Sequence, residues 1–108
     1  MIYQLRTYVI PPGRMDDILN RFENTTMDLF KKYGFEVLGF WTVSAPEDAH
    51  ELVYLLRFAD QEASDRAWAA FREDPDWQET RRRTEADGPI VAEVISKDLK
   101  AVDFSPLQ

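Results

Sequence analysis

Cysteine is absent from this chain, and histidine occurs once, as His50. The lack of thiols excludes disulfides, thiolate metal sites and a cysteine nucleophile. No second histidine and no HExxH spacing is present, so we expect no metal site. His50 falls in a predicted turn, where a solvated side chain is the ordinary expectation, and a general base or an axial ligand is the alternative.

Glycine is also scarce. The four glycines stand singly, so the chain has no glycine-rich phosphate loop and no dinucleotide fingerprint. We therefore expect no cofactor. With a single imidazole we do not expect haem either, although ligation through a tyrosine is left open.

Positive charge is in short supply, with 13 Lys and Arg against 20 Asp and Glu, for a net charge of −7. Nucleic acids and anionic membranes would be repelled, and no apolar run approaches the ~20 residues of a membrane span. We expect neither partner. A strand directly follows Met1 with no leader pattern, and a chain without cysteine suits a reducing compartment, so we expect a cytoplasmic protein.

What is present is an alternation of strand and helix patterns within 108 residues, enough for one domain spanning 1–108. The strands are predicted at 2–9, 35–43, 52–58 and 90–97, and the helices at 14–33, 61–73 and 75–86, before an extended tail over 98–108. Asp60, and Asp74 followed by Pro75, are the expected caps of the last two helices. The order βαββαβ predicts an α+β, ferredoxin-like fold: a four-stranded antiparallel sheet with helices on one face.

The predicted strands are apolar on both faces, but the helices are too few to cover both. The strand at 52–58 is the clearest case, and it should be central and buried. One face of the sheet must therefore be covered from outside the chain, and a second copy is the obvious source. We expect a homodimer in which the last strand and the tail through Phe104 pack against the partner.

Three polar residues, Gln4, Arg6 and Tyr8, face the same way from the first strand. In this topology the first strand is central, so these groups are buried and need partners. Either they form an internal hydrogen-bond network or Arg6 and Tyr8 orient a ligand. The sequence alone leaves both interpretations open.

Fourteen aromatic side chains are many for a chain of this size. Five of them, from strands and helices that should face one another, either wall an apolar cavity or fill the interface between sheet and helices. They are Trp41, Tyr54, Trp68, Phe71 and Trp77. The run Arg81-Arg82-Arg83 lies among acidic residues and is expected to be a solvated helical face with i, i+4 ion pairs.

Four short motifs, in order, resemble the NIPSNAP family. They are the opening Ile2-Tyr3-Gln4-Leu5-Arg6-Thr7-Tyr8, then Lys32-Tyr33-Gly34 followed by Gly39-Phe40-Trp41, then Asp60 with Arg66 and Asp74-Pro75-Asp76-Trp77, and the closing Phe104-Ser105-Pro106-Leu107. The resemblance implies a dimeric α/β barrel built from ferredoxin-like subunits. Its wider superfamily includes cofactor-free monooxygenases, isomerases, polyketide cyclases and haem-degrading enzymes, whereas the family itself has no settled activity.

This chain departs from the family pattern at three positions. Gln4 stands where the family often has Glu, Tyr54 where His is frequent, and Leu56 where Trp is frequent. If that Glu and His serve as acid and base, this chain has kept only hydrogen-bonding groups. The resemblance therefore leaves open whether the protein is an enzyme.

Two hypotheses follow. In the first, Gln4, Arg6, Tyr8, Trp41, Tyr54, Trp68 and Phe71 form a sheet–helix cleft that binds a small hydrophobic or aromatic carbonyl compound. Arg6 holds a carboxylate, phenolate or enolate and Tyr8 donates or relays a proton, for isomerisation, cyclisation or cofactor-free oxygenation. In the second, the protein is a non-enzymatic dimer that holds a ligand or a protein partner.

Overall fold

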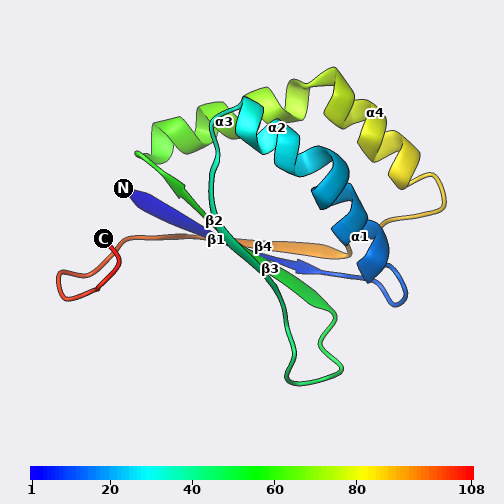
Figure 1. Ribbon diagram of the computed structural model, residues 1–108, viewed down its shortest axis with the longest axis horizontal. Helices are drawn as coiled ribbons and strands as arrows, with labels where there is room; N and C mark the ends of the chain where they lie inside the picture. Colours follow the sequence, from blue (N-terminus) through cyan, green and yellow to red (C-terminus); the bar gives the residue numbers. More distant parts are fainter.

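Four antiparallel strands form one sheet in the order β2-β3-β1-β4 (Figure 1). The computed structural model describes all 108 residues. The strands are β1 (Ile2–Val9), β2 (Glu36–Thr42), β3 (Glu51–Phe58) and β4 (Glu93–Leu99). The predicted α+β, ferredoxin-like order is confirmed, with β1 and β3 at the centre of the sheet.

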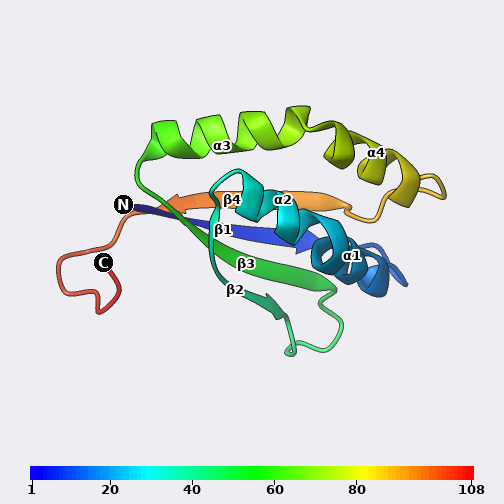
Figure 2. The same ribbon diagram turned by 45° about the horizontal axis from the view of Figure 1, so that its top comes forward.

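The helices all lie on one face of this sheet (Figure 2). The first helical rod consists of α1 (Met15–Arg21), a π-helical turn η1 (Phe22–Thr26) and α2 (Met27–Lys32). The second consists of α3 (Gln61–Glu73) and α4 (Pro75–Thr84). Both caps are confirmed, because Asp60 accepts from the Ala63 amide and Asp74 from the amides of Asp76 and Trp77. None of these helices has the length and the apolar character to cross a membrane.

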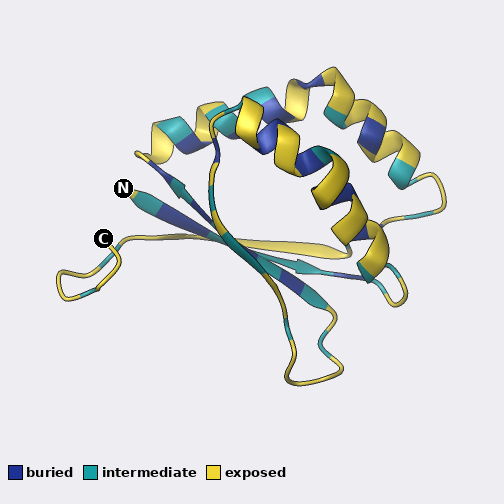
Figure 3. Ribbon diagram, viewed as in Figure 1, coloured by how far each residue is buried: buried dark blue, intermediate teal, exposed yellow.

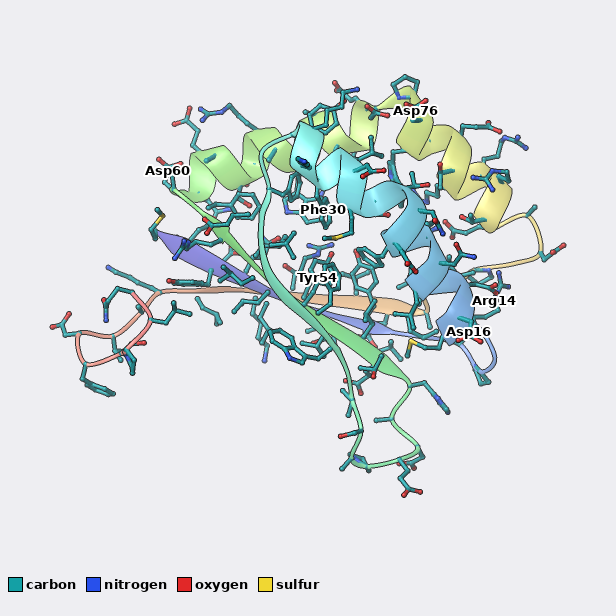
Figure 4. The ribbon with its side chains drawn as sticks, in the orientation of Figure 1. Arg14, Asp16, Phe30, Tyr54, Asp60 and Asp76 are labelled. Atoms are coloured by element: carbon teal, nitrogen blue, oxygen red, sulfur yellow. The ribbon has the colours of Figure 1, made fainter.

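Buried residues occur on both the sheet and the helices (Figure 3), and the core that they form is rich in aromatic rings. Tyr54 from β3 and Phe30 from α2 are both buried there, with ring centroids 6.2 Å apart (Figure 4). Phe30 also stacks on Phe35 at 4.4 Å. Alternate β3 residues enter this core, because successive side chains of a strand point to opposite faces.

Strand β2 departs from the predicted alternation. A β-bulge between Val37 and Gly39 leaves Leu38 without a partner on β3. The extra residue reverses which face the following side chains occupy. Val37 and Phe40 therefore both pack against the core, whereas Trp41 lies on the opposite face.

The last strand begins three residues later than predicted, at Glu93, and ends at Leu99. Ile90, expected to open it, is instead fully buried in the core, and the amide of Ala92 is bonded to the carbonyl of Val9. Burying the Ile90 side chain requires an irregular segment before the chain can join the edge of the sheet. The tail consequently starts at Lys100 rather than at Asp98.

The second face of the sheet, here called the open face, carries no helix (Figure 2). The pairing register places apolar side chains from all four strands on it. They are Leu5, Trp41, Val53, Leu55, Ile95 and Leu99. Trp41 is 54% exposed and Ile95 38% exposed, so this surface is uncovered in the single chain.

Candidate ligand-binding site

A cavity of about 330 Å³ lies between the sheet and the two helical rods. The sheet contributes lining residues from β1 and β4, and both helical rods contribute most of the rest. The residues with aromatic rings are Tyr8, Phe22, Phe30, Trp68, Phe71 and Trp77, and the charged ones are Arg6, Arg21, Arg72, Arg81, Glu85 and Glu93. Aromatic walls with a few polar groups are typical of sites for small molecules.

Arg6 reaches the cavity from β1, with its guanidinium 4.2 Å from the centre of a Trp68 ring. Its Nε donates to the Tyr54 hydroxyl at 2.8 Å and its Nη1 to the Ser96 hydroxyl at 3.3 Å. Burial alone lowers the pKa of Arg6, but the Tyr54 and Tyr8 oxygens outweigh burial and raise it. Arg6 is thus a charged group with neutral partners, and no carboxylate forms a salt bridge with it.

The Tyr54 hydroxyl makes two hydrogen bonds. It accepts from Arg6 and donates to the Tyr8 hydroxyl at 2.8 Å. Burial raises the pKa of Tyr54 well above its ordinary value, so Tyr54 is a neutral phenol with a proton to donate. Because the Tyr8 oxygen accepts from Tyr54, the proton of Tyr8 is left for another acceptor, and Tyr8 lines the cavity.

Gln4 supports the stacking of Arg6 on Trp68 from the side of the sheet. Its Oε1 accepts from the Trp68 indole at 2.7 Å, and its Nε2 donates to Asp98 at 3.0 Å and to Ser64 at 3.4 Å. A primary amide can do both at once, because it carries an acceptor and two donor hydrogens. Gln4 therefore fixes the ring on which Arg6 stacks.

The helical wall of the cavity carries a second cation. Arg21 from α1 is 7% exposed and stacks on Trp77 at 4.9 Å. Its Nη1 donates to Glu85 at 3.1 Å, and Arg81 pairs with the same carboxylate at 3.2 Å. Burial lowers the pKa of Arg21, and the hydrogen bond that Arg21 donates to Glu85 opposes that shift.

The charge of the lining differs in sign from that of the chain. Four arginines and two glutamates line the cavity, whereas the chain as a whole carries −7. One glutamate, Glu85, is shared by two of the arginines. The positive surplus, concentrated at Arg6, favours an anionic or strongly polarised oxygen in the cavity.

The structure brings together four of the seven predicted site residues on the cavity wall: Arg6, Tyr8, Trp68 and Phe71. Gln4 and Tyr54 lie directly behind them and act through hydrogen bonds. Placing Trp41 in this cleft was wrong, because the bulge at Leu38 turns it to the open face, where its ring packs over Gly39.

Several lining residues were not predicted, above all Arg21 and Thr26. Both occupy positions within the apolar stripe of the first helix, three residues after Ile18 and four after Phe22 respectively. A polar residue inside a buried stripe is the signal that points to them. Arg81 makes the predicted i, i+4 pair with Glu85 and also reaches the cavity, so its side of α4 is not purely solvated.

No group of three or more His, Asp or Glu side chains able to hold a metal ion occurs in the structure. His50 is exposed at the loop before β3, away from the cavity lining. The cavity therefore offers aromatic surfaces, guanidinium groups and a phenol as its recognition chemistry.

The sequence matches the NIPSNAP family over residues 3–106. This chain belongs to the NIPSNAP family. Among solved structures, a NIPSNAP family protein of unknown function from Agrobacterium tumefaciens is 23% identical, with a TM-score of 0.85, over 100% of this chain and 94% of that chain. A NIPSNAP domain protein from Burkholderia xenovorans is 22% identical, with a TM-score of 0.83, over 98% of this chain and 99% of that chain.

The NIPSNAP fold also resembles that of oxygenases. SnoaB, a cofactor-independent oxygenase from Streptomyces nogalater, is 12% identical, with a TM-score of 0.59, over 97% of this chain and 96% of that chain. At this identity the likeness concerns the fold alone. No curated protein matches the chain.

Proposed function

We propose that this NIPSNAP protein binds a small hydrophobic or aromatic compound whose carbonyl or acid oxygen rests on Arg6 and Tyr8. The observation that carries the proposal is the Arg6 guanidinium, stacked on Trp68 in an aromatic cavity with neutral partners only. A half-buried charge without a counter-ion lowers the stability of the protein, and an anionic ligand would supply that counter-ion. The unused proton of Tyr8 supplies a second hydrogen bond to the same ligand oxygen.

The chemistry that suits this pair proceeds through an enolate. Water takes the proton from the carbon beside the carbonyl, Arg6 stabilises the negative oxygen as it forms, and Tyr8 hydrogen-bonds to that oxygen or donates a proton to it. Isomerisation, cyclisation and oxygenation without a cofactor all share that intermediate. SnoaB, which has the same fold, is a cofactor-independent oxygenase, and this makes the reaction class worth testing here.

A non-enzymatic binding role is the second candidate, and the state of the cavity carboxylates favours it. Glu85 is held by Arg21 and Arg81, and Glu93 lies exposed on the edge strand. Neither is a free buried base, and efficient proton abstraction from carbon needs one within hydrogen-bond reach. In this role the cavity holds its ligand unchanged.

We further propose that the protein is a homodimer whose subunits meet through the open face. Trp41 and Ile95 are exposed there, and Phe104 in the tail is 89% exposed. Contiguous exposed apolar surface of this kind marks association sites. We also propose a cytoplasmic location, which suits a chain without cysteine.

A matched pair of probes tests the binding proposal. Cinnamate should bind the wild type, and its neutral analogue cinnamamide should bind at least ~10-fold more weakly, since hydrogen bonds to charged groups contribute more. Arg6→Gln should weaken cinnamate binding by a similar factor in calorimetric titration. Arg66→Gln, which removes an exposed arginine of α3, is the control. Equal binding of acid and amide, or of wild type and Arg6→Gln, contradicts the proposal.

A further inference from the structure

The helical wall of the cavity contains two buried polar atoms with no hydrogen-bond partner, Nε of Arg21 and Oγ1 of Thr26. Their residues are 7% and 3% exposed, and both line the cavity. Buried polar atoms in folded proteins are almost always paired, because an unpaired one loses its bonds to water without replacement. Two such atoms, in two residues of one cavity wall, suggest that a ligand supplies the missing partner once these side chains turn toward the cavity.

The local backbone provides a second, independent observation. Thr26 ends the π-helical turn η1, in which the Met27 amide bonds to the carbonyl of Phe22. π-helical turns are rare, and they occur frequently at functional sites. Phe22 and Thr26, at the two ends of this turn, both line the cavity.

The chemistry of these atoms specifies what they bind. Nε of Arg21 only donates, so its partner must be an acceptor oxygen, and the Thr26 hydroxyl can donate to the same atom. The charge of Arg21 is partly compensated by Glu85, which Arg81 shares. The acceptor that suits this wall is therefore a neutral oxygen, in contrast to the acidic one that suits Arg6.

We infer that Arg21 and Thr26 form a second subsite, which binds a neutral hydroxyl or carbonyl oxygen of the ligand. The ligand is then an aromatic acid or enolate with a second oxygen substituent away from its acid group. This inference rests on the proposed function, because Arg6 defines the other end of the ligand.

Positional isomers test the inference. Cinnamate and its ortho, meta and para hydroxy derivatives are titrated into the wild type, into Thr26→Val, and into Thr25→Val as the control. Thr25 belongs to the same turn but does not line the cavity. At least one isomer should bind the wild type and Thr25→Val at least ~5-fold tighter than cinnamate, as expected for one added hydrogen bond. In Thr26→Val that advantage should vanish while cinnamate itself binds as before.

Stability of the free protein gives an independent readout. Since Oγ1 of Thr26 has no partner, Thr26→Val should leave the thermal midpoint unchanged or raise it. A lowered midpoint shows a hidden structural bond and overturns the inference. If cinnamate binds through Arg6 but no isomer gains affinity, the second subsite is wrong and the proposed function stands. If cinnamate does not bind the wild type, both fall.

Discussion

The guanidinium of Arg6 lies 4.2 Å from the centre of a Trp68 ring, and the indole nitrogen of Trp68 is held by Gln4. One strand, β1, thus supplies both the charge and the residue that fixes its stacking partner. Arg6 and Gln4 share a face because they are two residues apart on a strand. The charged end of the cavity therefore depends on two nearby residues of one central strand.

Replacing Gln4 with glutamate should destabilise the protein. In Gln4→Glu the buried carboxyl would face Asp98, which now accepts from Nε2 at 3.0 Å. The introduced carboxylate would be buried and repelled by the exposed carboxylate of Asp98, so the free energy of unfolding at neutral pH should fall by roughly 3 kcal/mol. Chemical denaturation measures the loss.

The direction in which the destabilisation by Gln4→Glu changes with pH also follows from this contact. Repulsion and burial raise the pKa of the introduced carboxyl, so the penalty exists above that pKa and fades as the pH falls through it. Gln61→Glu is the matched control, because Gln61 Nε2 donates to Asp65 at the same 3.0 Å on the exposed face of α3. A Gln4→Glu variant no less stable than Gln61→Glu contradicts this view of Gln4.

Tyr8 should matter for turnover more than for folding. If the cavity supports enolate chemistry, the wild type should accelerate exchange of the methylene hydrogens of phenylpyruvate with solvent deuterium. Tyr8→Phe keeps the ring that packs on Phe22 and Tyr54 but removes the hydroxyl, and should slow the exchange ~100-fold, within the usual range for general acid–base catalysis. Proton NMR follows the signal loss. Exchange no faster than in buffer alone would favour the non-enzymatic role.

Asp74 links the two helical rods and should make stability depend on acid pH. It caps α4 and accepts hydrogen bonds from Tyr33 and Lys32. The Tyr33 hydrogen bond, together with those from Lys32 and the α4 amides, lowers the pKa of Asp74 to about 2. A lowered pKa stabilises the fold above the ordinary value near ~4, and the contribution is lost as the pH falls toward ~2.

The difference in unfolding free energy between wild type and Asp74→Asn should therefore shrink over that range. Tyr33→Phe removes the leading cause of the shift, so the wild type should lose more stability than Tyr33→Phe as the pH falls over that range. Urea denaturation at a series of pH values measures both. An Asp74→Asn difference that stays constant with pH would show that Asp74 acts only as a neutral cap.

Phe104 should report on assembly. Its side chain is 89% exposed, so Phe104→Ser costs an isolated subunit almost nothing. If the tail packs on a partner, the same change should weaken dimerisation at least ~10-fold in sedimentation equilibrium. Leu19→Ser, at a 37% exposed leucine of α1, is the control. A wild-type mass equal to the 12.6 kDa of a single chain rules the dimer out.

The elements of the fold were predictable because each carries a local signal. The alternation of 2–9 gave β1 at its true limits, and Asp60 marked the start of α3. The bulge at Leu38 and the π turn at 22–26 carry no such signal, since apolar spacing continues through both. The bulge is why Trp41 was misplaced.

The site, too, was predictable only in part. Arg6 and Tyr8 were identifiable as polar residues on a strand that topology makes central. Arg21 ends α1 and Glu85 directly follows α4, and only the folded chain brings them together at 3.1 Å. How far the positive charge of the cavity is compensated therefore depends on contacts that sequence spacing does not contain.

The most direct test of the proposed ligand site is a crystal structure of the protein grown with cinnamate. We predict the carboxylate within hydrogen-bond distance of Arg6 and Tyr8, with the ring between the sheet and the helical rods. A cavity that stays empty at saturating cinnamate, or a ligand bound elsewhere with Arg6 untouched, would contradict it.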